Sequence, residues 1–410
     1  MKFHKCYFSF LFLSISLFMQ AQTVSQWRGA NREGNYNESR LMQTWPESGP
    51  SMLWFNEDIG NGYGSPILTS DKLFINGETD STSFLFAYDL KGKLLWKTPN
   101  GPEFTGDGFS RSFPGGRSTP TLAGDLVYVC SGKGRIACIE SQTGKEKWAA
   151  EMATGLDGIT PTFGYSESLL IDGDMLFCSP GGTNTNIAAL NRFTGKPIWT
   201  SKVLSDTLSY CSPMIINLPQ RKILVSMSIY YIVGLDAKTG ELLWSQKQEN
   251  VKYKQQCNTP IFADGFLYYV AGDGNGAVKL KISDDGKSFK EIWRNGQMTN
   301  TFNGFVKLDN HLFTPDRSQK IKCIDEITGQ VTDSIRMNKG ALISAGKMLY
   351  CYSDNGEVNL IKLTGTKMEV VGKLKITKGS KEHFAHPVIS NGILYVRHGK
   401  ALMAYDIKEK

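Results

Sequence analysis

The chain has 410 residues, of which 40% are hydrophobic and 21% are charged. This balance is that of a globular protein, and it excludes an intrinsically disordered chain. The formal net charge is +7, but the basic residues are scattered without an arginine-rich run, so we do not expect the protein to bind nucleic acid.

The first 21 residues have the composition of a targeting segment. Lys2 and Lys5 stand before an apolar stretch of residues 6–19, and Ala21 leads into polar sequence. This order indicates a secretory signal peptide that is cleaved after Ala21. No cysteine stands at the new N-terminus, so we expect no lipid anchor, and no later stretch is apolar for long enough to span a bilayer. We therefore predict an exported protein, in the periplasm or outside the cell of a Gram-negative bacterium.

Two segments precede the repeated part of the chain. Residues 22–50 form a predicted N-terminal extension that packs on the main domain. The segment that follows, Ser51-Met52-Leu53-Trp54-Phe55, has the pattern of a strand that carries a tryptophan. Residues 51–410 are expected to form one domain.

The main domain repeats one phrase along the chain. Its three clearest copies are Thr143-Gly144-Lys145-Glu146-Lys147-Trp148, Thr194-Gly195-Lys196-Pro197-Ile198-Trp199 and Thr239-Gly240-Glu241-Leu242-Leu243-Trp244. The tryptophans are roughly 45 to 50 residues apart, which is the repeat length of propeller blades. Each phrase follows an apolar run, and Asp-Gly and Asn-Gly pairs mark hairpin turns between the other runs.

A second column of positions opens the first strand of each unit. These positions are 66, 120, 168, 213, 260, 305, 342 and 387. Each unit then contains four short strands, and in the sixth and seventh units the fourth strands fall at residues 331–335 and 368–371 without a tryptophan. The eighth unit ends before its fourth strand. We predict an all-β, eight-bladed β-propeller with four-stranded antiparallel blades, in which the N-terminal strand with Trp54 completes the last blade and closes the ring.

These columns resemble the secreted pyrroloquinoline-quinone-like, or BamB-like, β-propeller repeat family. The resemblance is carried by Leu126-Val127-Tyr128-Val129, by the Thr-Gly phrases, and by the opening Trp27-Arg28-Gly29-Ala30-Asn31-Arg32-Glu33-Gly34. It implies that the repeated tryptophans pack between neighbouring blades and do not stack on a cofactor; these are Trp96, Trp148, Trp199, Trp244 and Trp293.

The same family contains both enzymes and proteins without catalytic function. Its dehydrogenases hold pyrroloquinoline quinone (PQQ) with a calcium ion, whereas its scaffold members work without a cofactor. This chain has no adjacent cysteines and no CxxCH haem motif, and no Glu/Asn/Asp set for calcium can be matched in it. We therefore expect a non-catalytic binding or scaffold propeller of the cell envelope, with no cofactor and no metal, whose partner is an envelope protein, a small molecule or a glycan. The alternative is a PQQ-dependent oxidoreductase or a glycan-processing enzyme acting at the same rim.

Function is expected in the variable residues just before each strand-opening position, because these residues surround the mouth of the central channel. Aromatic rings mixed with a few polar groups suit a ligand that stacks and is oriented by hydrogen bonds, although the same residues would also fill and cap an empty channel. The candidates are Tyr63, Arg111, Arg117, Tyr165, Glu167, Tyr210, Asn258, Phe302, Asn303 and His386.

The titratable and thiol groups of this rim give two further expectations. If the rim is catalytic, Asp157, Glu167 and His386 are the groups that would act, and a channel plugged by aromatic side chains would argue against an enzyme. Cys211 and Cys257 occupy nearly the same rim position on neighbouring blades. We expect two free thiols there rather than a disulfide.

Overall fold

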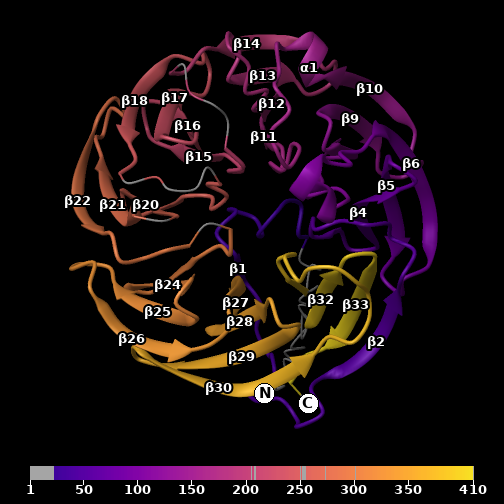
Figure 1. The fold of residues 1–410 in the computed structure, drawn as a ribbon, viewed down its shortest axis with the longest axis vertical. Coiled ribbons are helices and arrows are strands. Elements are labelled where there is room, and N and C mark those ends of the chain that lie inside the picture. The colour runs from indigo at the N-terminus through magenta and orange to yellow at the C-terminus, as the bar shows by residue number, and fades with distance from the viewer. Residues whose placement is uncertain are drawn as a thin grey trace, which may run out of the picture.

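The computed structural model describes residues 23–409 except 205, 207, 208, 250, 252–254, 273 and 301. The predicted signal peptide lies outside the described residues. The described chain is a ring of eight β-sheets around a central axis, as Figure 1 shows. No helix of this part is long and apolar enough to cross a membrane.

The first four blades follow one another in chain order. Blade 1 contains β3 (Ile67–Leu68), β4 (Lys72–Thr79), β5 (Thr82–Asp89) and β6 (Leu94–Pro102). Blade 2 contains β7 (Thr121–Ala123), β8 (Leu126–Cys130), β9 (Arg135–Glu140) and β10 (Glu146–Glu151). Blade 3 contains β11 (Leu170–Asp172), β12 (Met175–Cys178), β13 (Ile187–Asn191) and β14 (Pro197–Ser201). Blade 4 contains β15 (Met214–Asn217), β16 (Lys222–Met227), β17 (Tyr231–Asp236) and β18 (Leu242–Lys247).

The second half continues around the axis in the same way. Blade 5 contains β19 (Ile261–Ala263), β20 (Phe266–Ala271), β21 (Gly276–Ile282) and β22 (Phe289–Asn295). Blade 6 contains β23 (Val306–Leu308), β24 (His311–Asp316), β25 (Lys320–Asp325) and β26 (Val331–Arg336). Blade 7 contains β27 (Gly340–Ala345), β28 (Met348–Ser353), β29 (Glu357–Thr364) and β30 (Lys367–Lys375), with β1 (Asn35–Tyr36) added parallel to β27. Blade 8 contains β31 (Val388–Ser390), β32 (Ile393–His398), β33 (Ala401–Asp406) and β2 (Ser51–Asn56).

The ring closes in the way that the sequence predicted. β2 pairs antiparallel with β33, so a strand from the N-terminal side of the chain is the outer strand of the last blade. The pairing joins Ser51 to Asp406 and Asn56 to Leu402. Both predictions, eight blades and closure by the strand that carries Trp54, are therefore confirmed. Closure satisfies the edge of β33, which would otherwise expose unpaired backbone groups.

The Thr-Gly turn and the tryptophan of neighbouring blades form one joint. Trp148 of blade 2 lies over Gly195 in the turn of blade 3, where a Cβ atom would come within 2.5 Å of the indole. The indole N–H of Trp148 donates to the carbonyl of Arg192 in the same turn, at 2.9 Å. Trp199 and Gly240 repeat the arrangement between blades 3 and 4. The repeated phrase is therefore an inter-blade contact, as the family resemblance implied.

Hydroxyl groups at the strand openings join the inner ends of blades 1 to 4. The backbone N–H of Ser65 donates to Thr119 Oγ1, the N–H of Thr119 to Ser168 Oγ, and the N–H of Ser168 to Ser212 Oγ, each at 2.9 Å. Each hydroxyl satisfies a buried backbone group of the preceding blade. This explains why serine or threonine stands beside so many of the strand-opening positions.

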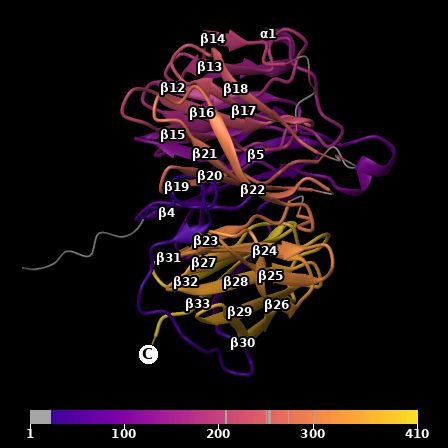
Figure 2. The same ribbon diagram turned by 90° about the vertical axis from the view of Figure 1, so that its left-hand side faces the viewer.

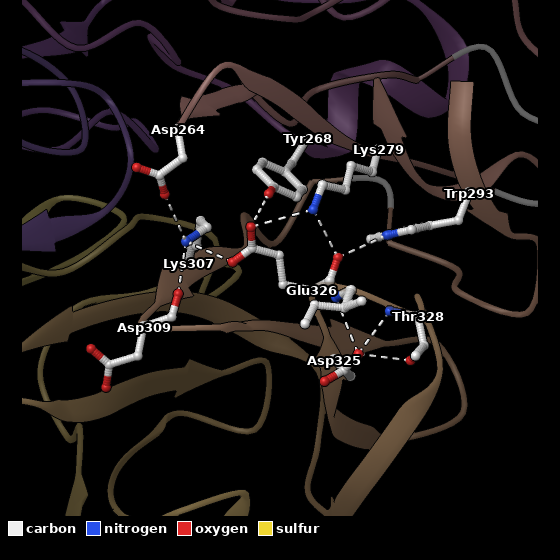
Figure 3. A network of polar contacts seen from close by, with 10 residues as sticks. Asp264, Tyr268, Lys279, Trp293, Lys307, Asp309, Asp325, Glu326 and Thr328 are labelled. Atoms are coloured by element: carbon white, nitrogen blue, oxygen red, sulfur yellow. Dashed lines mark hydrogen bonds and ion pairs between the residues drawn. The ribbon is translucent and has the colours of Figure 1, made fainter. Parts of the chain in front are cut away.

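A polar network lies between blades 5 and 6 beside their apolar contact, as Figure 3 shows. Glu326 accepts hydrogen bonds from Tyr268 and from Lys279, the latter at 3.3 Å, and pairs with Lys307 at 3.0 Å. The indole of Trp293 donates to the Glu326 carbonyl at 2.9 Å. Burial alone would raise the pKa of Glu326, but the hydrogen bond from Tyr268 and the two lysines hold it below its usual value.

The N-terminal segment crosses the centre of the ring before it reaches β1, as the indigo trace in Figure 1 shows. Arg32 donates to the carbonyls of Ser168 and Pro213, at 2.8 and 3.1 Å. Arg28 donates to the carbonyls of Phe305 and Leu342. These four carbonyls belong to four of the eight strand-opening positions, so the two arginines bind blades 3, 4, 6 and 7. Both side chains are buried, and desolvation lowers the pKa of each to about 10.

Beyond β1 the segment runs along the last blades, which Figure 2 shows from the side. The N–H of Met42 donates to the carbonyl of Ile407 at 2.9 Å, and the N–H of Trp45 to the carbonyl of Val371 at 3.2 Å. The segment then enters β2 and completes the last blade.

Candidate functional site

A cavity of about 310 Å³ opens at the axis of the ring, where the loops that precede the innermost strands converge. Eight of its described lining residues are aromatic and two are arginines, and none of the described lining residues is an acid. These residues are Trp27, Tyr63, Phe109, Phe113, Arg117, Phe163, Ser166, Ser168, Tyr210, Ser212, Gln255, Cys257, Phe302, Arg317, Phe384 and His386. Its size is at the lower end of the range of about 300–1,000 Å³ that is usual for ligand pockets.

Each blade contributes one residue, three positions before its strand opening, to a column that surrounds the axis. Six of its eight members line the cavity: Tyr63, Arg117, Tyr210, Cys257, Phe302 and Phe384. The blades place them there because equivalent positions of a closed ring lie at equal depth around one axis. The column that the repeat singles out therefore lies around the cavity.

The closed end of the cavity is formed by Trp27, which the N-terminal segment carries to the axis. The Trp27 indole meets the His386 ring edge to face, with 5.4 Å between the ring centroids. Ser168 and Ser212, the hydroxyls that join neighbouring blades, also lie at this end and are buried. The channel at this level is therefore filled by protein, and the cavity is a pocket rather than a pore.

The open end is surrounded by phenyl rings from two inserted loops. The first loop contains the 3-10 helix η1 (Gly108–Ser112), and the second follows the short helix α1 (Met152–Gly155). Phe113 and Phe163 meet edge to face with 6.2 Å between centroids, and Phe113 stacks on Phe384 at 6.3 Å. Phe109 lies at the mouth of the cavity, with 74% of its surface exposed. These rings form the rim and leave the pocket open.

Arg117 provides positive charge at the wall. Its guanidinium donates to the carbonyls of Phe113 and Gly115, which fixes both the side chain and the loop. It also lies over the Tyr63 ring, 5.5 Å from the centroid. Burial lowers the pKa of Arg117, and this effect exceeds the opposing influence of Tyr63 and of Glu103. Tyr63 in turn donates to Glu382 Oε2 at 2.8 Å.

Five of the ten predicted site residues line the cavity, and the other five lie elsewhere. The five that line it are Tyr63, Arg117, Tyr210, Phe302 and His386. Tyr165 donates to the Pro180 carbonyl at 2.9 Å, and Asn258 donates to the carbonyls of Val270 and Asn300 at 2.9 and 2.7 Å. Asn303 is also buried, and its N–H donates to Asn300 Oδ1 at 3.0 Å.

The remaining two predicted residues are charged. Arg111 points outward from η1 and pairs with Asp107 at 3.9 Å, and both side chains are exposed. Glu167 is buried and accepts hydrogen bonds from the N–H and hydroxyl of Ser179, so it completes the inner end of blade 3. Neither residue lines the cavity.

The three groups named as potential catalysts differ in their surroundings. Desolvation raises the pKa of Glu167 to about 7, against the hydrogen bonds from Ser179 and the charge of Arg32. Asp157 accepts from the N–H of Asn184 at 2.8 Å and holds a turn. Only His386 lines the cavity, and burial, together with the nearby Arg28, lowers its pKa well below the usual value. His386 is therefore a neutral ring at neutral pH.

Sequence reasoning missed several members of the site. Trp27 belongs to the N-terminal segment, which carries no repeat signal, and its position follows only from the buried bonds of Arg28 and Arg32. Phe109 lies in an inserted loop outside the repeat columns. Gln255 and Arg317 also line the cavity from outside the column that we considered. Their loop positions are the only signal that could have marked them.

The donors of the cavity do not fit a calcium-bound quinone. Calcium prefers several carboxylate and carbonyl oxygens, but the side chains of the described lining offer hydroxyls, one amide, a thiol, an indole, an imidazole and two guanidinium groups. In the described part of the chain, no group of three or more His, Cys, Asp or Glu side chains is placed to hold a metal ion. We therefore derive no chemistry through PQQ.

Cys257, which lines the cavity, and Cys211 are free thiols. Cys211 is buried and Cys257 is partly buried, and neither forms a disulfide. The expectation of two free thiols is confirmed. Burial raises the pKa of Cys257 to about 12 and also raises the pKa of Cys211, so both are protonated and unreactive at neutral pH.

Comparison with known proteins places the chain near two groups. The family model described as "Outer membrane protein assembly factor BamB" matches residues 81–335. The chain is 20% identical over 304 residues to the outer membrane protein assembly factor BamB of Shewanella oneidensis, covering 72% of this chain and 69% of that protein. It is 24% identical over 211 residues to the quinoprotein alcohol dehydrogenase PedH of Pseudomonas putida, but this match covers 48% of the chain and 32% of the dehydrogenase.

Solved structures show the same fold in both groups. BamB from Moraxella catarrhalis superposes with a TM-score of 0.62 at 14% identity, over 87% of this chain and 99% of that one. The quinohemoprotein alcohol dehydrogenase from Comamonas testosteroni superposes with a TM-score of 0.67 at 11% identity, over 95% and 81%. At such identities these similarities establish the fold and do not choose between binding and catalysis.

Proposed function

This chain belongs to the family of the outer membrane protein assembly factor BamB, and from that premise we propose that it is an exported, non-catalytic binding propeller of the bacterial cell envelope. Its binding site is the axial cavity, and its ligand is a partner protein of the envelope. The observation that carries this proposal is the chemistry of the cavity wall. Eight aromatic rings and two arginines suit recognition, whereas the described wall offers no carboxylate that could act as an acid or a base.

The family relationship supports the scaffold role. The match to BamB of Shewanella oneidensis spans about two thirds of both chains, whereas the match to the dehydrogenase covers a third of that enzyme. A scaffold needs a fixed surface, and the buried bonds of Arg28 and Arg32 fix the closed end of this cavity.

Site-specific photo-crosslinking in cells tests the proposal. A benzophenone amino acid replaces Phe109, which is exposed at the mouth, and in a matched strain it replaces Phe193, which is 49% exposed on a turn of blade 3. We expect a discrete adduct with an envelope protein from position 109 and none from position 193. Equal adducts from both positions, or none at position 109, would refute a binding role for the cavity.

A PQQ-dependent oxidoreductase is the second candidate, favoured by the similarity to PedH alone. It is tested by adding PQQ with calcium to the purified protein and recording the melting temperature. A ligand that binds only the folded state raises the melting temperature. At a free concentration one hundred times its Kd, it adds about 2.7 kcal/mol to the free energy of unfolding. A shift that requires both PQQ and calcium would overturn the non-catalytic proposal.

A further inference from the structure

Resting on the proposed function, we infer that the cavity takes an aromatic side chain of a partner peptide that carries a carboxylate nearby. The first step is the apolar part of the wall. Phe113, Phe163, Phe302 and Phe384 present ring edges and faces to one another at centroid distances of 5.5 to 6.3 Å. An inserted ring finds edge-to-face and stacked partners there, which aliphatic side chains cannot use.

The second step is the sign of the charge. The described lining holds Arg117 and Arg317 and no acid, and His386 is neutral. Lys339 lies beside the wall, with its ammonium 5.9 Å from the Phe302 ring centroid, and Asp354 pairs with it at 3.9 Å. Two further acids, Glu103 and Glu382, lie near Arg117 and act on it through their charge, but neither lines the cavity. An aromatic ligand that carries negative charge therefore fits better than a neutral or a cationic one.

The third step is the donor that would meet the carboxylate. Arg117 is held in place by the carbonyls of Phe113 and Gly115, so its planar group is oriented before a ligand arrives. A guanidinium has five N–H donors, and those two bonds leave others for an acceptor. Because the group is largely buried, an incoming carboxylate meets a charge that water screens little.

The fourth step is the extended shape of the ligand. A volume of about 310 Å³ holds one or two aromatic side chains but not a folded element. The aromatic wall continues, however, to the exposed Phe109 at the mouth, and the exposed Arg111 lies outside the pocket, 3.9 Å from Asp107. A peptide that inserts one ring and continues over η1 uses both parts of this surface, whereas a free aromatic acid uses only the pocket.

Fluorescence anisotropy with short labelled peptides tests the inference. The probe contains two phenylalanines that flank an aspartate within a glycine-serine sequence. Its matched counterparts carry lysine for the aspartate, or leucine for both phenylalanines. We expect the parent peptide to bind at least about tenfold more tightly than either counterpart, which corresponds to one well-placed ring or ionic contact. Equal affinity for the aspartate and lysine peptides would overturn the charge assignment, and equal affinity for the leucine peptide would overturn the aromatic one.

Variants of the protein locate the binding. Phe302→Ala and Arg117→Gln are each expected to weaken binding of the parent peptide about tenfold or more. Phe193→Ala, on the outer surface, is the matched control and is expected to leave binding unchanged. Circular dichroism of each variant checks folding. Folded cavity variants that bind as tightly as the wild type would overturn the inference.

Two further comparisons complete the test. The first distinguishes a peptide from a free aromatic acid, and the second distinguishes a wrong ligand class from a wrong proposed function. N-acetylphenylalanine, a free aromatic acid, is expected to bind at least about tenfold more weakly than the peptide. Equal affinity would overturn the peptide assignment. If no peptide binds while the crosslink at position 109 still forms, the ligand class is wrong and the proposed function stands. If the crosslink fails as well, both are wrong.

Discussion

Arg28 and Arg32, four residues apart in the chain, hold different sides of the propeller across its axis. Arg28 donates to carbonyls of blades 6 and 7, and Arg32 to carbonyls of blades 3 and 4. A segment without regular structure thereby connects four of the eight blades and delivers Trp27 to the closed end of the cavity. Tertiary bonds of this kind make the N-terminal segment part of the ring.

Replacing Arg32 by methionine should destabilise the protein. The change removes a buried charge and leaves the carbonyls of Ser168 and Pro213 without their donor, which costs about 3 kcal/mol or more in the free energy of unfolding. Urea denaturation measures the loss. Arg111→Met, at an exposed arginine, is the control and should change the stability by less than about 0.5 kcal/mol. Equal effects of the two changes would show that the bonds of Arg32 do not hold the ring.

The joint between blades 2 and 3 predicts a strong effect of one added methyl group. Gly195 has φ of +71°, and a Cβ atom there would lie 2.5 Å from the Trp148 indole. We expect Gly195→Ala to lower the free energy of unfolding by about 3 kcal/mol, from the left-handed backbone and the clash together. Gly173→Ala is the matched control, because Gly173 has φ of +56° and open space around it. It should cost about 1 kcal/mol, and equal losses would contradict the packing argument.

Glu167 predicts a decline of stability as the pH rises. Its pKa in the folded protein is raised from 4.5 to about 7, so the folded state keeps the proton that the unfolded state loses between these values. The stabilisation is complete below pH 4.5 and is lost as the pH rises toward 7. Glu167→Gln should remove this slope from a plot of unfolding free energy against pH. An unchanged slope in the variant would assign the pH dependence to other groups.

Glu326 predicts the opposite dependence. Burial would raise its pKa, but the bond from Tyr268 and the charges of Lys307 and Lys279 hold it below the usual 4.5. The ionised group therefore stabilises the fold above pH 4.5, and this contribution is lost as the pH falls through the lowered pKa. Glu326→Gln should be less stable than the wild type at pH 7, and the difference should shrink below pH 4.5. A constant difference across this range, measured by urea denaturation at each pH, would contradict the prediction.

Much of the fold could be predicted because each repeat is recognisable as a local sequence pattern. The Thr-Gly turn, the tryptophan and the strand-opening residues recur in phase, and each blade buries the same contacts against its neighbour. The fourth strands at Val331–Arg336 and Lys367–Lys375 were also located without a tryptophan, from the spacing of the repeat. The cavity was harder to predict. The column that ends in Phe384 marks its wall, but Tyr165 and Asn258 point into protein because local bonds to carbonyls hold them there.

The sequence by itself determined the number of blades, the closure of the ring through Trp54 and the height at which variable residues surround the axis. These features follow from the periodicity of the sequence, which is visible without any knowledge of tertiary contacts. Only the tertiary structure decided that the channel ends at Trp27, that Arg117 is partly buried and oriented, and that Glu167 lies apart from the cavity. The end of the channel depends on contacts between residues more than a hundred positions apart, such as Arg32 with Ser168 and Trp27 with His386, which no local pattern encodes. Arg117 and Glu167 are held by nearer partners, Phe113 and Ser179 among them, in loop geometries that the repeat does not specify.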